Sequence, residues 1–112
     1  MFNKLQIVWT AALSIASLVA NANSIPMAAN PSTWRLENYV GGGNAVVVWY
    51  TNSTCANGNL SLGNNNTAED RNRFYATVME AKATNRSMFV YYDNASAPGS
   101  CLIISFGIDV GQ

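Results

Sequence analysis

The stretch Thr67–Ala83, TAEDRNRFYATVMEAKA, predicts the helix of this 112-residue chain, and the other elements are placed by their order around it. Thr67 and Asp70 stand three residues apart, as in the capping box that starts a helix, here with Asp in place of Glu. Apolar side chains then recur at the helical spacing and form one stripe for burial. The stripe consists of Phe74, Tyr75, Val78, Met79 and the aliphatic stem of Lys82. We expect the helix to end near Ala83.

Strand patterns lie on both sides of this helix. Alternating and β-branched runs, separated by Gly- and Asn-containing turns, predict three strands before the helix and two after it. The predicted strands are Thr33–Val40, Ala45–Thr51, Asn59–Leu62, Ser87–Asp93 and Cys101–Phe106. Ile25–Pro31 is expected as an irregular lead-in, and Gly107–Gln112 as a tail able to extend the last strand. This element order is that of the OB-fold, so we expect a small β-rich α+β domain built as a five-stranded OB-like barrel with one helix.

The first 22 residues have the features of a secretory signal peptide. Lys4 supplies the positive end, Ile7–Ala20 is a short apolar stretch, and Ala20-Asn21-Ala22 fits the A-x-A rule for cleavage. The stretch is too short and too rich in Ala, Ser and Thr to span a bilayer comfortably; a retained N-terminal anchor is the alternative. We therefore expect residues 23–112 to form a single OB-like domain, secreted or periplasmic, with no membrane span.

The two cysteines, Cys55 and Cys101, both lie in the expected mature domain. In an exported chain such a pair predicts a disulfide, with free thiols or a bridge between chains as the alternatives. In an OB-fold the third and fifth strands are parallel neighbours, so both cysteines would lie at the same end of adjacent strands, where a bridge is feasible. The predicted bridge and the predicted strand order thus support each other.

The charged and catalytic residue types exclude several functions. Without Lys4 the chain has five basic and six acidic residues, which is too little positive charge for a nucleic-acid partner. It has no histidine, so the usual general base and the common nucleophile–base pairs are missing. Glu69 and Asp70 are adjacent carboxylates, but the start of a helix explains both. We expect a non-enzyme without a metal ion or cofactor.

Three of the predicted strands are apolar on both faces. They contain Val46–Tyr50, Phe89–Tyr92 and Leu102–Ile104. In a small barrel one face of each strand meets water, so strands of this kind need a second cover. A ligand groove or a subunit interface would supply it, and burial by the helix and the barrel ends is the alternative. We favour association into a homo-oligomer.

Aromatic and neutral polar residues near the predicted loops indicate a carbohydrate ligand. OB-folds bind oligosaccharides or oligonucleotides through loops that correspond here to Gly41–Asn44 and Asp93–Ser100. The candidate ligand-binding residues are Trp49, Tyr50, Tyr91, Tyr92, Asp93 and Asn94. Aromatic rings stack on sugar rings, and amide groups pair with sugar hydroxyls, although each ring taken singly also fits a core or interface position.

An exported chain of this size, with one disulfide, an OB-type element order and a helix over Asp70–Ala83, resembles the B subunits of bacterial AB5 toxins. The resemblance implies a secreted OB-fold protein that assembles into a ring with the helices at its centre and binds host-cell glycans. It rests on architecture, so no binding residue is carried over from the family. The alternative is a stand-alone secreted or periplasmic protein that acts as a structural component or inhibitor with a protein partner.

Overall fold

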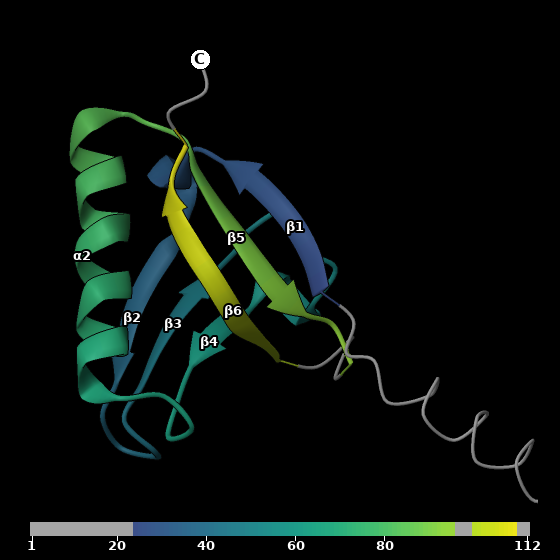
Figure 1. Ribbon diagram of the computed structural model, residues 1–112, viewed down its shortest axis with the longest axis vertical. Helices are drawn as coiled ribbons and strands as arrows, with labels where there is room; N and C mark the ends of the chain where they lie inside the picture. The colour runs from purple at the N-terminus through teal and green to yellow at the C-terminus, as the bar shows by residue number, and fades with distance from the viewer. Residues whose placement is uncertain (1–23, 96–99, 110–112) are drawn as a thin grey trace, which may run out of the picture.

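The computed structural model describes residues 24–95 and 100–109, and within them the chain forms one six-stranded sheet and one α-helix (Figure 1). The elements are β1 (Ser24–Ala29), η1 (Pro31–Thr33), β2 (Arg35–Tyr39), β3 (Ala45–Trp49), η2 (Ala56–Gly58), β4 (Leu60–Leu62), α2 (Ala68–Thr84), β5 (Met88–Asp93) and β6 (Cys101–Ile108). The predicted signal peptide, the centre of the Asp93–Ser100 loop and the last three residues lie outside the described residues. The small β-rich α+β class is confirmed.

The strands follow the order β1-β5-β6-β4-β3-β2, and every neighbouring pair is antiparallel except β4 and β6. The predicted parallel pairing of the third and fifth strands is therefore confirmed, as β4 with β6. The sheet is open, with β1 and β2 as its two edges, so the predicted five-stranded barrel is not confirmed.

The sixth strand corrects the prediction for Ile25–Pro31. Ser24–Ala29 is not irregular: it pairs along its whole length with β5, and Pro26 lies opposite Tyr91. Proline is tolerated there because β1 is an edge strand, where one row of backbone groups has no partner strand. At the other end of the chain β6 runs on to Ile108, as the tail was expected to allow.

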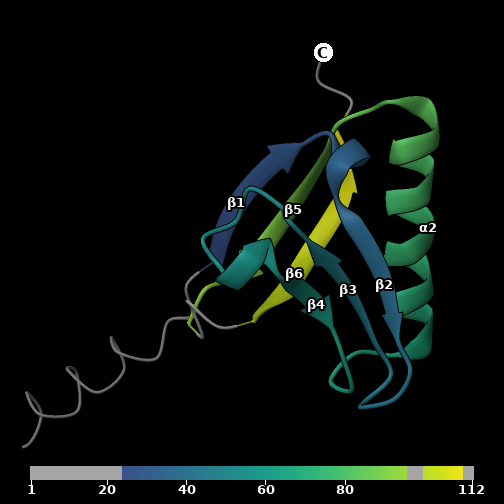
Figure 2. The ribbon, with the colours of Figure 1, turned by 180° about the vertical axis from the view of Figure 1, so that it is seen from behind.

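The sheet is strongly coiled, so that β1, β5 and β6 lie in front of β2, β3 and β4 in Figure 1 and behind them in Figure 2, with α2 along one side. The core fills the inside of this coil. Its buried strand residues are Val46, Val48, Leu60, Leu62, Met88, Val90, Tyr92, Cys101 and Ile103. From the helix, Phe74 meets Phe106 edge to face at 5.0 Å between ring centroids. Full burial of a side chain such as Phe74 contributes about 1.5–3 kcal/mol to stability.

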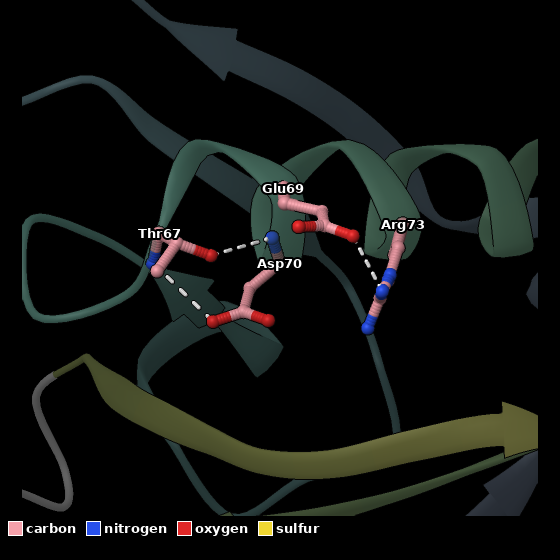
Figure 3. A network of polar contacts seen from close by, with 4 residues as sticks. All are labelled: Thr67, Glu69, Asp70 and Arg73. Atoms are coloured by element: carbon pink, nitrogen blue, oxygen red, sulfur yellow. Dashed lines mark hydrogen bonds and ion pairs between the residues drawn. The ribbon is translucent and has the colours of Figure 1, made fainter.

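The helix begins with the predicted capping box. Thr67 Oγ1 accepts from the Asp70 N–H at 3.0 Å, and Asp70 Oδ2 accepts from the Thr67 N–H at 3.3 Å (Figure 3). Glu69 forms an exposed ion pair with Arg73 one turn later. Both carboxylates are therefore engaged in helix contacts, as expected.

The buried stripe of α2 differs from the predicted one. Phe74 and Val78 are buried as expected, but Met79 is 47% exposed and Ala81 is fully buried in its place. The three buried positions stand at i, i+4 and i+7, so they share one face of the helix, and Met79 falls outside it. The Lys82 stem lies as predicted at the edge, and its Nζ donates to the Trp34 carbonyl.

The bridge between Cys55 and Cys101 is present, with 6.0 Å between the two Cα atoms. It fastens the segment after β3 to the first residue of β6. Gly58 completes this corner, because its φ of +62° suits glycine and a Cβ there would lie 2.4 Å from the Thr51 backbone nitrogen. The end of the sheet at which β4 and β6 start is therefore tightly fixed.

Candidate functional site

The outward side of strands β2, β3 and β4 carries a row of paired side chains. Val46 and Val48 of β3 belong to the core, so Val47 and Trp49 point to the opposite, outer side. Residues directly opposite each other share a face of the sheet. The cross-strand pairs on this side are Arg35–Trp49, Glu37–Val47, Tyr39–Ala45 and Val47–Ser61. The predicted ligand residue Trp49 thus belongs to a continuous outer surface.

A groove of about 320 Å³ lies on this surface, and we call it the Trp49 groove. It is lined by Tyr39, Ala45, Val47, Trp49, Asn59, Ser61 and Ser100. The lining combines two aromatic rings and two aliphatic side chains with three neutral polar residues, and it contains no charged side chain. Small-molecule pockets span roughly 300–1,000 Å³, so this groove suits a small ligand or the terminal unit of a larger one.

The Trp49 indole is held in place by a chain of polar contacts. Its Nε1 donates to Glu37 Oε1 at 2.9 Å, and Arg35 Nη2 donates to Glu37 Oε2 at 2.7 Å. The carboxylate therefore bridges a cation and the indole N–H, which restrains the rotation of the ring. Because the indole N–H is already satisfied, Trp49 offers a ligand its apolar ring face.

Asn59 brings an unsatisfied polar group to the same groove. Its residue is only 8% exposed, and its Oδ1 has no hydrogen-bond partner among the described residues. The backbone is fixed on both sides, because the Asn59 N–H donates to Ala56 O and the Asn59 carbonyl accepts from the Cys101 N–H. Buried polar groups in proteins are almost always paired, so this amide is the most unusual polar group of the site.

Tyr39 closes the groove on the side of the β2–β3 hairpin. Its ring lies against Gly42, where an added Cβ would come within 2.9 Å of Tyr39 Cε1. Gly41 next to it has no atom within 4 Å of such a Cβ. The position of the Tyr39 ring thus depends on the absence of a side chain at Gly42.

A second groove, of about 410 Å³, lies across β1 and β5, and we call it the β1–β5 groove. It is lined by Pro26, Met27, Ala28, Phe89 and Tyr91. The Phe89 and Tyr91 rings meet edge to face at 6.1 Å, and a Cβ at Gly107 would come within 2.7 Å of the Phe89 ring. This groove is apolar and aromatic, and its one side-chain polar group is the Tyr91 hydroxyl.

The structure separates the predicted ligand residues. Trp49 lies in the Trp49 groove and Tyr91 in the β1–β5 groove. Tyr92 is 2% exposed in the core, and its hydroxyl lies 3.3 Å from the Thr54 N–H that donates to it. Its buried ring has no face free for a sugar, so this placement speaks against a ligand-stacking role.

The other three predicted residues lie at the ends of strands. Tyr50 follows β3 with a φ of +64° and is 59% exposed, and its N–H donates to the Asn57 carbonyl at 2.7 Å. Asp93 Oδ1 accepts from the Ala95 N–H at 2.8 Å and so caps the turn that follows β5. Asn94 is half-buried, and its Oδ1 has no partner among the described residues. None of the three lines the Trp49 groove.

Trp49 is the one lining residue that was predicted as a ligand residue. The other six are Tyr39, Ala45, Val47, Asn59, Ser61 and Ser100, of which Ser100 ends the predicted binding loop. Side chains alternate between the two faces of a strand, so Glu37 and Tyr39 share one face, and this alternation is the sequence signal for Tyr39. Asn59 and Ser100 come together through the β4–β6 pairing and the neighbouring disulfide, which bring together residues 41 positions apart. A pattern within one strand carries no such information.

Within residues 24–95 and 100–109 there is no group of three or more His, Cys, Asp or Glu side chains that could hold a metal ion. In the same part of the chain, no helix is long and apolar enough to cross a membrane. No model of a known protein family, no curated protein and no solved structure matches this chain.

Proposed function

We propose that this chain is a secreted, non-catalytic carbohydrate-binding module that holds a sugar in the Trp49 groove. The observation that carries the proposal is the composition of the lining: an indole fixed through Glu37, a second ring at Tyr39, and neutral amide and hydroxyl groups beside them. Aromatic rings stack on the apolar faces of sugar rings, and hydroxyls and amides both donate to and accept from sugar hydroxyls. The groove therefore suits a sugar better than a polyanion.

Secretion, to the periplasm or beyond, is supported by two features. The signal-peptide pattern of residues 1–22 directs export, and the Cys55–Cys101 bridge suits an oxidising compartment. A protein of the cytosol would keep these two thiols reduced.

Copies of the chain associate, and a ring like that of the AB5 toxin B subunits is the proposed form. The apolar residues Leu102 and Ile104 of β6 are exposed, and β1 and β2 are open edges that present unpaired backbone groups. Mass measurement of the native protein is expected to give a multiple of the chain mass. A strict monomer at micromolar concentration would contradict the association.

The alternative function is a stand-alone structural or inhibitory protein with a protein partner. The apolar β1–β5 groove favours it, because large apolar side chains in a concave surface are typical of protein contacts. The two functions differ in which groove matters, and this difference defines the experiment.

The test is a glycan array with the protein expressed from the full chain, in three forms: wild type, Trp49→Ala and Tyr91→Ala. Tyr91→Ala is the matched control because it removes an outward-facing ring from the other groove. We expect Trp49→Ala to lower the affinity for the bound glycans at least about tenfold, since stacked rings contribute strongly to such sites, and Tyr91→Ala to leave it within about twofold. Binding that is absent in wild type or unchanged in Trp49→Ala refutes the carbohydrate function of this groove.

A further inference from the structure

The Asn59 amide gives the Trp49 groove a chemical selectivity beyond sugar binding in general. We infer that the groove selects an uncharged sugar bearing an acetamido group, and that Asn59 pairs with this group. The inference rests on the proposed carbohydrate function. It adds the class of sugar and the residue that recognises it.

The Asn59 side chain is buried beside the groove with an unpaired oxygen. It is more than nine-tenths buried, it lines the groove, and its Oδ1 has no hydrogen-bond partner among the described residues. An unpaired buried carbonyl costs free energy, and because Oδ1 is covered as the side chain stands, a ligand donor reaches it only after the amide turns. Rotation by half a turn about χ2 exchanges the two ends of the amide, so Asn59 can turn either its carbonyl or its NH2 group to the groove.

The backbone around this amide is held by hydrogen bonds and by the disulfide. The Asn59 backbone is hydrogen-bonded to η2 through Ala56 and to β6 through Cys101. Cys101 is bonded in turn to Cys55. The amide is therefore presented by a preorganised corner of the fold, and little conformational entropy is lost when a ligand binds to it.

The polar and apolar groups of the lining match those of an acetamido group. This group is a planar amide with one N–H donor, one carbonyl acceptor and one methyl group, so it is the counterpart of an asparagine side chain. Val47 and Ala45 in the same lining offer apolar contact to the methyl group, and Trp49 offers its ring face to the sugar ring. A hydroxyl at the same position of the sugar would pair with the amide but leave the apolar surface without a partner.

The charges in and around the lining favour an uncharged sugar. The lining has no cationic side chain, and two charged residues lie opposite lining residues on the same face: Glu37 opposite Val47 and Arg35 opposite Trp49. The Arg35 guanidinium is already paired with the Glu37 carboxylate. An anionic sugar would therefore find no unpaired cation in the lining or opposite it, which disfavours it.

The experiment measures the affinity of the full-chain protein for N-acetylglucosamine, N-acetylgalactosamine, glucose, galactose and N-acetylneuraminic acid by calorimetry. We expect each acetamido sugar to bind at least about tenfold more tightly than its hydroxyl counterpart and more tightly than the anionic sugar. In Asn59→Asp, which keeps an acceptor but loses the NH2 donor for the acetamido carbonyl, this preference is expected to weaken. Asn52→Asp, an exposed position in the same segment, is the matched control and should retain it.

A second measurement covers the case in which Asn59→Asp does not fold. In wild-type protein labelled with ¹⁵N, the Asn59 side-chain NH2 signals should shift on addition of N-acetylglucosamine and stay in place with glucose. Unchanged signals overturn the role of Asn59.

The outcomes separate this inference from the proposed function. If glucose and N-acetylglucosamine bind equally and Trp49→Ala abolishes both, the acetamido selectivity is wrong and the carbohydrate function stands. Tightest binding of N-acetylneuraminic acid overturns the uncharged class alone. If none of these sugars nor any glycan on the array binds, both proposals fail.

Discussion

The Trp49 groove and the β1–β5 groove lie on the outer surface of the same coiled sheet, yet they are built from different chemistry. In the Trp49 groove a carboxylate fixes the indole, and a buried amide and two serines stand beside it. In the β1–β5 groove, rings and aliphatic groups hold one another, and Phe89 lies over Gly107. Directed polar groups give specificity for a small ligand, whereas apolar surface supplies non-directional association. The two halves of one sheet thus present surfaces of different chemistry, one suited to the proposed small ligand and the other to a protein contact.

The largest expected effect concerns the bridge, whose Cys101 follows the Trp49-groove residue Ser100 in the chain. Replacement of both cysteines, Cys55→Ser with Cys101→Ser, should lower the free energy of unfolding by about 4 kcal/mol, because a bridge across 46 positions restricts the unfolded chain. Urea unfolding measures this loss. Since the Cys101 N–H donates to the Asn59 carbonyl, the variant should also lose sugar affinity.

Hydrogen exchange of the same variant sharpens the comparison between the two grooves. The backbone amides of β4 should exchange faster than in wild type, while those of β5 opposite β1 should change less. Equal acceleration in both strands would mean that the two grooves do not have separate supports.

The next largest effect is expected from a substitution beside the β1–β5 groove. In Gly107→Ala the new Cβ would approach the Phe89 ring to 2.7 Å, so the ring must move. Because a side chain yields more easily than backbone, we expect a loss of only about 1 kcal/mol in stability, measured by thermal unfolding. Sugar affinity should remain that of the wild type, and assembly measured by native mass should weaken. A loss of sugar binding instead would show that the two grooves are coupled.

The sequence predicts those parts of the fold that depend on neighbouring residues alone or that have only one possible pairing. The capping box needs only Thr67 and Asp70, and two cysteines allow a single intramolecular pairing. The strand β1 was missed because Pro26 is typical of irregular segments, and its tolerance depends on being at an edge, which only the assembled sheet defines. Whether the sheet closes into a barrel or stays open likewise depends on the pairing of strands that are far apart in the sequence.

The candidate site was harder to predict because it depends on which face each residue takes. Phe89–Tyr92 is apolar at every position, so periodicity could not tell the outward Tyr91 from the buried Tyr92. An extra residue in β6, Ile104, sits opposite this point of β5, where the register shifts. Trp49 could be predicted because it is aromatic and near a loop, whereas Asn59, which lines the same groove, is recognisable only after β4 and β6 have been paired.

The smallest expected effect tests whether the position of a single ring matters in the Trp49 groove. Gly42→Ala would place a Cβ 2.9 Å from Tyr39 Cε1 and push the ring aside, while Gly41→Ala meets nothing within 4 Å. Both glycines lie in the exposed hairpin loop or at its edge, so stability should change by less than about 0.5 kcal/mol in either variant. Calorimetry should show sugar affinity reduced about threefold in Gly42→Ala, the size expected for one displaced ring contact, and unchanged in Gly41→Ala. Equal affinities in the two variants would remove Tyr39 from the site and leave Trp49 as the ring on which the sugar stacks.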